Sequence, residues 1–80
     1  MDLREATKHR ILELVEELNT TVTALSLQSN LTPSTVFEFL SGKSKYPTII
    51  TIKKLCAGAG ITLEEFFARD YFNDFDEVYK

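Results

Sequence analysis

Hydroxyl side chains gather at one predicted helix start near the middle of the chain. Thr32 is followed by Pro33, and Thr as N-cap with Pro at the first helical position is a sharp helix-start signal. Ser34 and Thr35 come next, so hydroxyls and free backbone N–H groups are expected to meet at one helix end. The positive end of the helix dipole and these donors can together bind a phosphate group. The sequence therefore predicts anion-binding chemistry at this position.

The rest of the chain lacks the spacing that catalysis or metal binding needs. The one cysteine, Cys56, is expected to be a small buried hydrophobe rather than a redox sensor. His9 has no histidine or cysteine partner near it in the sequence with which to hold a metal ion. The glutamate pairs at 16–17 and 64–65 have no histidine or nucleophile nearby and are expected to be solvated helix faces or caps. We therefore expect no enzyme activity, no cofactor and no bound metal.

Two short helices joined by a tight turn surround this helix start. Thr21 offers an N-cap for a helix from about Val22 to Ser29, and Asn30 tolerates the left-handed conformation at its end. The next helix would run from Pro33 to about Ser41 and stop at Gly42. This is helix-turn-helix spacing, in which the second helix is presented for insertion into the major groove of DNA.

Helical periodicity gives the second of these helices an inward and an outward face. Val36, Phe39 and Leu40 are expected to face the core, together with Val22 and Leu25 of the preceding helix. The outward stripe is expected to consist of Pro33, Ser34, Phe37, Glu38 and Ser41. These outward side chains are the candidates for contact with a ligand.

Three further helices complete an all-α prediction with no credible strand. The first helix runs from Leu3 to Leu18, with its apolar residues mostly on one side: Leu3, Ala6, Ile11, Leu14, Val15 and Leu18. Another helix spans about Thr48 to Ala59 and ends at Gly60, with one apolar face: Ile49, Ile52, Leu55 and Cys56. Thr62 and Glu65 form a capping box ahead of Phe66 and Phe67. A chain of 80 residues can bury one shared core with this arrangement.

The order of short sequence pieces from Arg10 to Phe67 resembles the phage-repressor and Cro-type helix-turn-helix family, the xenobiotic-response-element-like regulators. The pieces that carry the resemblance are Arg10-Ile11, Glu13-Leu14, Leu31 to Val36, Ser41-Gly42-Lys43, Pro47-Thr48, Thr51 to Cys56, and Gly60 to Phe67. The resemblance implies a five-helix, lambda-repressor-like DNA-binding domain that acts as a dimeric transcription regulator. Symmetric dimers of this kind bind two half-sites about 34–36 Å apart or a multiple of that distance.

The resemblance also implies roles for individual side chains. Thr21, Val22 and Thr23 would open the helix that lies across the DNA backbone, and Thr35 would contact phosphate. Lys43 and Lys45 would lie in a loop that approaches phosphate. Four residues of the second helix would face base edges: Pro33, Ser34, Phe37 and Glu38.

Two of these positions depart from the family pattern, which tends to have polar donors or amides at 37 and 38. No Arg, Lys, Asn or Gln occurs from Thr32 to Ser41, so strong bidentate contacts to guanine or adenine are absent there. Phe37 could touch a thymine methyl and Glu38 could accept from cytosine N4. An exposed Phe37 would otherwise contact a protein, or indicate that the helix is rotated from this assignment.

The net charge of −3 opposes nucleic-acid binding, but its distribution does not. Residues 1–31 carry −2 and residues 63–80 carry −4, whereas residues 32–62 carry +3. That positive segment has four lysines and one acid: Lys43, Lys45, Lys53, Lys54 and Glu38. Because screening acts over roughly 8 Å at physiological salt, local charge governs the attraction to phosphate. We expect a modest electrostatic affinity that dimerisation would increase.

The C-terminal end is acidic and aromatic. We divide the chain into a helix-turn-helix domain at 1–69 and a tail at 70–80. Of nine aromatic residues, six follow residue 65: Phe66, Phe67, Tyr71, Phe72, Phe75 and Tyr79. Tyr71, Phe72 and Phe75 would fold back over the first helix or form an exposed patch for a homodimer or another protein partner.

The single cysteine precludes an intramolecular disulfide, and the charged N-terminus has no apolar signal sequence. These features predict a cytoplasmic protein with no membrane contact. The sequence thus favours a small regulator of transcription that inserts Thr32–Ser41 into the major groove of double-stranded DNA. The alternative is a protein-interaction module, such as an antitoxin-like or anti-regulator subunit, that keeps the fold with little or no DNA readout.

Overall fold

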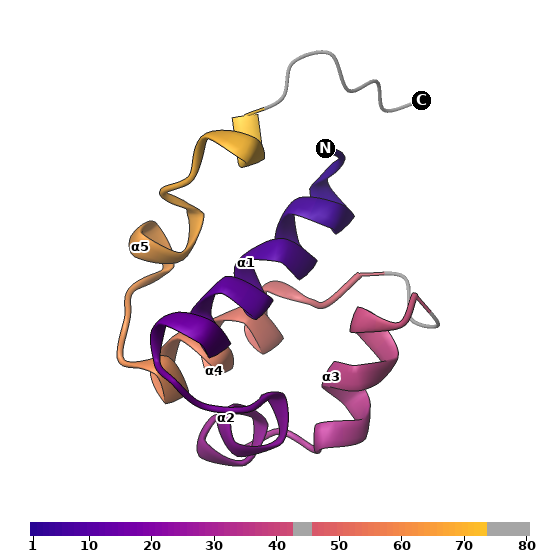
Figure 1. Cartoon of the computed structure of the whole chain (residues 1–80), viewed down its shortest axis with the longest axis vertical. Coiled ribbons are helices and arrows are strands. Elements are labelled where there is room, and N and C mark those ends of the chain that lie inside the picture. The colour runs from indigo at the N-terminus through magenta and orange to yellow at the C-terminus, as the bar shows by residue number, and fades with distance from the viewer. Residues whose placement is uncertain (43–45, 74–80) are drawn as a thin grey trace.

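The computed structural model describes residues 1–42 and 46–73, and within these ranges every regular element is helical. The elements are α1 (Leu3–Glu17), α2 (Val22–Gln28), α3 (Pro33–Leu40), α4 (Ile49–Ala59), α5 (Leu63–Phe67) and a 3-10 turn, η1 (Asp70–Asn73). In Figure 1, α1 runs through the middle of the molecule, with α3 on one side and α5 on the other. The all-α, five-helix prediction is confirmed.

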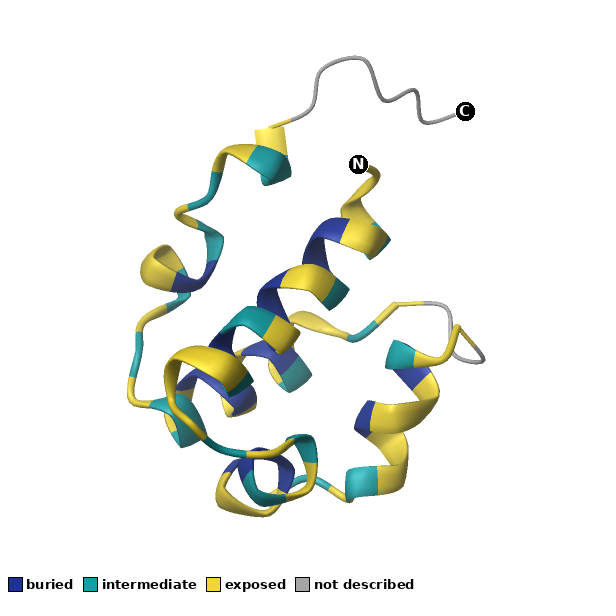
Figure 2. Ribbon diagram, viewed as in Figure 1, coloured by how far each residue is buried: buried dark blue, intermediate teal, exposed yellow. Residues whose placement is uncertain are grey.

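The core forms where α1, α2 and α4 meet, closed by one residue from α3 and one from α5. Its buried members are Ile11, Leu14, Leu25, Phe39, Ile52, Leu55, Cys56 and Phe66. Figure 2 shows these buried positions as dark blue segments on the facing sides of the helices. Val36 is also buried, whereas Leu40 is half-buried against the core and Val22 is half-buried as well. The predicted inward faces are confirmed in their main residues.

Three residues predicted on apolar inward faces are instead exposed. Leu3 retains 42% of its accessible surface, Leu18 44% and Ile49 58%. Leu3 and Ile49 are the first residues of α1 and α4, and Leu18 is the C-cap of α1. All three lie at the ends of their helices, where neighbouring structure generally covers less of a side chain than it does in the middle. Periodicity predicts which side a residue faces but not how far the covering element reaches.

Local capping sets most helix boundaries. The hydroxyls of Thr21 and Thr48 accept hydrogen bonds from the backbone N–H of Ala24 (3.0 Å) and Thr51 (3.1 Å). The capping box of α5 is present in both directions, with Glu65 N–H to Thr62 Oγ1 at 3.0 Å and Thr62 N–H to Glu65 Oε1 at 2.9 Å. Gly60 ends α4 in the left-handed conformation at φ 74°. These boundaries follow the predicted ones within two residues.

The C-cap of α2 packs against α4 at a glycine. An added Cβ at Gly58 would lie 2.9 Å from both the backbone N and the Cα of Ser29. Backbone atoms cannot rotate away as a side chain can, so any larger residue at 58 would push the two helices apart. Gly58 therefore sets how closely α2 approaches α4.

The start of the C-terminal tail folds back over α1, as the first of the two sequence-based alternatives predicts. The ring of Tyr71 meets that of His9 edge-on at 4.9 Å between centroids, and Phe72 lies 5.0 Å from Phe67. Phe75 and Tyr79 lie outside the described residues. Across 1–42 and 46–73, none of the helices combines the length and the apolar character that a membrane span requires.

Candidate nucleic-acid interface

The turn between α2 and α3 is held by backbone hydrogen bonds. Asn30 adopts φ 58°, and its N–H donates to the Leu27 carbonyl at 3.1 Å. The N–H of Leu31 donates to the Ser26 carbonyl at 2.9 Å, which completes a Schellman motif. Thr32 then leads into Pro33 at the first helical position of α3. The left-handed Asn30 and the proline start of α3 are both as the sequence predicts.

The outward stripe of α3 is open to solvent. Phe37 retains 48% of its accessible surface, and Ser34, Thr35, Glu38 and Ser41 are exposed. Pro33 is half-buried at the start of the helix. Because Val36 and Phe39 are buried on the opposite side, α3 is not rotated from the predicted assignment, and Phe37 faces away from the core. Figure 2 shows this side of α3 largely in yellow.

The threonine hydroxyls at the starts of α2 and α3 differ in whether they form a capping hydrogen bond. The hydroxyl of Thr21 caps α2, whereas Thr32 occupies the N-cap position of α3 without a side-chain capping hydrogen bond. The carbonyl of Thr32 accepts from the N–H of Thr35 at 3.0 Å. Pro33 has no N–H, so within the described residues Ser34 carries the first backbone donor of α3. Thr32 therefore keeps its exposed hydroxyl for another partner, although the predicted cap is not made by its side chain.

The remaining predicted contacts are distributed over two elements. Thr23 is exposed in the first turn of α2 and Val22 beside it is half-buried. Ser41, the C-cap of α3, donates its hydroxyl to the Glu38 carbonyl at 3.1 Å. Lys43 and Lys45 lie outside the described residues. The structure thus brings the α2 and α3 candidates onto two adjoining helices.

One cation near α3 was missed by reasoning from the sequence. The guanidinium carbon of Arg4 lies 5.7 Å from the centroid of the Phe39 ring. An added Cβ at Gly42 would be 3.7 Å from Arg4 Nη2, which places Arg4 beside the C-terminal end of α3. No spacing rule connects residues 4 and 42, because only the folded chain brings α1 and α3 together. Arg4 adds positive charge to a helix that carries none of its own.

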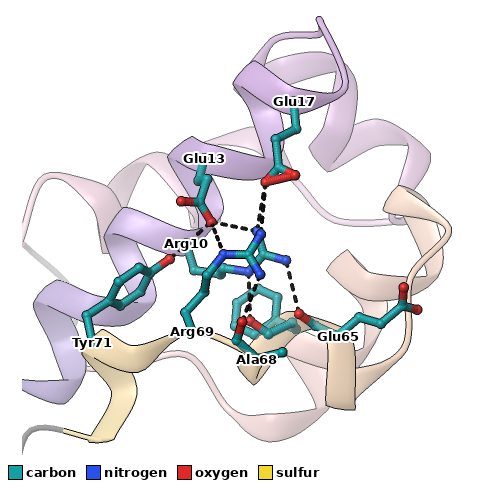
Figure 3. A network of polar contacts seen from close by, with 8 residues as sticks. Arg10, Glu13, Glu17, Glu65, Ala68, Arg69 and Tyr71 are labelled. Carbon is teal, nitrogen blue, oxygen red and sulfur yellow. Dashed lines mark hydrogen bonds and ion pairs between the residues drawn. The ribbon is translucent and has the colours of Figure 1, made fainter.

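A buried arginine fixes α5 against α1 (Figure 3). Arg10 is 3% exposed, and its Nε donates to the Phe66 carbonyl at 2.7 Å while Nη2 donates to the Glu65 carbonyl at 3.1 Å. Its Nη1 donates to Glu13 Oε1 at 2.9 Å and to Glu17 Oε1 at 3.1 Å. Burial of the guanidinium is tolerated because its donors have carbonyl or carboxylate partners. Glu17 is therefore not the purely solvated residue that the sequence predicts.

The same carboxylates hold the C-terminal turn. Glu13 Oε1 accepts from Arg69 Nε at 2.8 Å and from the Tyr71 hydroxyl at 3.2 Å. Burial tends to raise the pKa of Glu13, but the hydrogen bond and charge of Arg69, with Tyr71 and Arg10, lower it overall. For Tyr71, burial and the neighbouring Glu13 charge raise the pKa. The network joins α1 to α5 and to the turn that follows it, and it includes no residue of the outward stripe.

A family model described as the Cro/C1-type HTH DNA-binding domain matches residues 10–70. Among solved structures, the crystal structure of the prophage Lp1 protein 11 is 34% identical in sequence to this chain. Its TM-score is 0.78, and the alignment covers 98% of this chain and 100% of that one. The comparison with curated proteins found no match. The chain belongs to the Cro/C1-type helix-turn-helix DNA-binding family, which confirms the resemblance described from its sequence.

Proposed function

We propose that this chain regulates transcription by inserting α3 into the major groove of double-stranded DNA. The observation that carries the proposal is the solvent-exposed stripe of α3, which the α2–α3 turn presents within a Cro/C1-type domain. The α3 helix is eight residues long, and in this proposal its N-terminal residues reach base edges. In this account the protein acts in the cytoplasm and carries out no catalysis.

The contacts divide into those that position the protein and those that read bases. Thr21, Thr23, Thr32 and Thr35 offer hydroxyls to phosphates, with Val22 beside the backbone, and Lys43 and Lys45 add charge. Pro33, Ser34, Phe37 and Glu38 face the base edges, and Ser41 follows at the end of the same stripe. Phe37 would contact a thymine methyl and Glu38 would accept from cytosine N4. Because none of these side chains is a bidentate donor, each contact discriminates only modestly between base pairs.

Dimerisation through the C-terminal region would compensate for this modest affinity. Two α3 helices related by a two-fold axis would read half-sites about 34–36 Å apart or a multiple of that distance. The half-buried Tyr71 and Phe72 of η1 support such a contact because their rings are only partly covered within one chain. Sedimentation equilibrium with and without a palindromic duplex would measure the association.

A titration against random-sequence duplex DNA at two salt concentrations tests the phosphate contacts. We expect binding that weakens as salt increases, since each neutralised phosphate releases counterions. Lys43→Glu with Lys45→Glu should weaken binding at every sequence, whereas Lys8→Glu on α1 serves as the charge-matched control. Affinity that is unchanged by the lysine pair would contradict the proposed phosphate contacts.

Phe37 supports a second candidate function, that of a protein-interaction module. A phenylalanine with about half its surface exposed, beside an acid, also suits a protein partner. Phe37→Ser distinguishes the two functions. Weaker DNA binding is expected if α3 reads DNA, whereas loss of a co-purifying protein with unchanged DNA affinity would favour the interaction module.

A further inference from the structure

A small pocket lies between α3 and the segment that leads into α4. It encloses about 200 Å³, and its apolar walls come from Val36, Phe39, Tyr46 and Pro47. Val36 and Phe39 are each 4% exposed and belong to the buried side of α3, whereas Tyr46 is 57% exposed. The pocket therefore has a buried apolar floor and a side that opens to solvent.

Three threonines supply the polar part of the lining: Thr35 of α3, and Thr48 and Thr51 at the start of α4. The hydroxyls of Thr48 and Thr51 lie 3.1 Å apart, and Thr48 Oγ1 accepts the Thr51 N–H at 3.1 Å, so these two groups are engaged with each other. Thr35 is exposed, and its hydroxyl has no hydrogen-bond partner among the described residues. Of the three, Thr35 therefore has the hydroxyl that is available to a ligand.

The size and the charge of the lining restrict the ligand. An engineered apolar cavity of about 150 Å³ holds benzene, so a pocket of about 200 Å³ accommodates one aromatic ring with a small substituent. None of the described lining residues is charged. An ion that leaves water without meeting an opposite charge loses free energy of hydration. The pocket therefore favours an uncharged molecule of single-ring size.

We propose that this pocket binds an uncharged, single-ring aromatic molecule that carries a hydroxyl group. The rings of Phe39 and Tyr46 favour an aromatic ligand, because pairs of aromatic rings attract each other beyond the area that they bury. The hydroxyl of the ligand would form a hydrogen bond with that of Thr35, since each can both donate and accept. Phenol is the simplest such molecule and serves as the probe.

A methyl NMR titration of the full chain with phenol locates the site. We expect saturable shifts of the methyl signals of Thr35, Val36 and Thr51. The signals of Leu27, which is 64% exposed on α2 and does not line the pocket, are expected to stay unchanged. Unshifted Val36 signals, or shifts of Leu27 as large as those of Val36, would overturn the proposal.

Two analogues of phenol test the chemistry of recognition. Toluene keeps the ring but has a methyl group in place of the hydroxyl, and we expect it to bind about two- to tenfold more weakly, the effect of one neutral hydrogen bond. Benzoate keeps the ring but is ionised at neutral pH, and we expect no saturable shifts with it. Toluene or benzoate binding as tight as that of phenol would contradict the proposed class of ligand.

Thr35→Val removes the proposed hydrogen-bond partner and nearly preserves the shape of the side chain. Phenol affinity is expected to fall by about two- to tenfold. Toluene affinity should stay the same, which a general distortion of the pocket would not produce. The matched control, Thr23→Val, lies at an exposed position on α2 outside the pocket and should leave phenol affinity unchanged. Unchanged phenol affinity in Thr35→Val, or an equal loss for toluene, would overturn the role of Thr35.

A bound ligand would lie against the helix that the proposed function inserts into DNA, and its effect on DNA binding rests on that function. One Thr35 hydroxyl cannot serve both phenol and a phosphate, so saturating phenol is expected to lower the affinity for duplex DNA by about two- to tenfold. Duplex affinity that phenol does not change would overturn this competition. A chain that binds phenol but no duplex would contradict the proposed function and leave the ligand site in place.

Discussion

Glu13 Oε1 accepts a hydrogen bond from Arg69 Nε at 2.8 Å, although 56 positions separate the two residues along the chain. The same oxygen accepts from buried Arg10 at 2.9 Å and from the Tyr71 hydroxyl at 3.2 Å. One carboxylate thus joins α1 to the segment that follows α5. Because α1 also contributes Ile11 and Leu14 to the core, this contact fixes the C-terminal end to the body that carries α2 and α3.

Loss of this carboxylate charge should destabilise the fold. Glu13→Gln removes the charge that Arg10 and Arg69 both contact and leaves buried Arg10 with a weaker acceptor. We expect a loss of about 1.5–3 kcal/mol in the free energy of unfolding, the range for hydrogen bonds to charged groups. Urea denaturation measures it. Glu16→Gln, at an exposed position on the same helix, is the control, and its free energy of unfolding should stay within about 0.5 kcal/mol of that of the native chain. Equal losses of stability for the substitutions at 13 and 16 would contradict the role of the network.

The same residue predicts how stability depends on pH. Burial opposes ionisation of Glu13, but Arg69 and its other partners hold the pKa of the carboxyl below its ordinary value in the folded state. A carboxyl with a lowered folded-state pKa stabilises the fold fully above its unfolded-state pKa, about 4.3 for glutamate. That contribution is lost as the pH falls through the folded-state pKa.

The native chain should therefore lose more stability on acidification from about pH 6 to about pH 3 than Glu13→Gln does. Urea midpoints at the two pH values measure the difference. A parallel decrease in both proteins would show that Glu13 does not contribute to the acid sensitivity.

Gly58→Ala should destabilise the fold, although glycine to alanine stabilises an ordinary exposed helix by roughly 0.5–1 kcal/mol. The added Cβ would meet the backbone of Ser29 at 2.9 Å, so α2 and α4 must separate. We expect a net loss of about 1–3 kcal/mol, as for overpacked cores. Thermal unfolding measures this loss against Lys54→Ala, an exposed substitution on the same helix. A gain in stability would show that the α2–α4 contact is looser than described.

Local signals in the sequence predict the helices well, because a cap needs only residues within one turn of each other. Thr21 and the Thr62 capping box begin helices, and Asn30 and Gly60 end them, where the sequence indicates. The same holds for the outward stripe of α3, which follows from the burial of Val36 and Phe39.

Contacts between distant residues could not be predicted in this way. The Arg10 network joins α1 to residues 55 and 56 positions further on, and no periodicity encodes which carboxylate an arginine will meet. The exposure of Ile49 and the close approach at Gly58 depend likewise on where neighbouring helices end. The position of Arg4 beside the end of α3 could not be predicted either, because it is set by the packing of α1.

A selection of bound sites from a random duplex library, made with the native chain and with Glu38→Gln, tests DNA reading by α3 most directly. Glutamate accepts from cytosine N4, whereas glutamine pairs with adenine N6 and N7. We predict that the native chain enriches a motif with a cytosine at the position that Glu38 contacts. For Glu38→Gln that cytosine should be replaced by adenine. The control Glu64→Gln, at an exposed position on α5, should leave the motif unchanged. No enriched motif, or the same motif with all three proteins, would contradict base reading by Glu38 from the major groove.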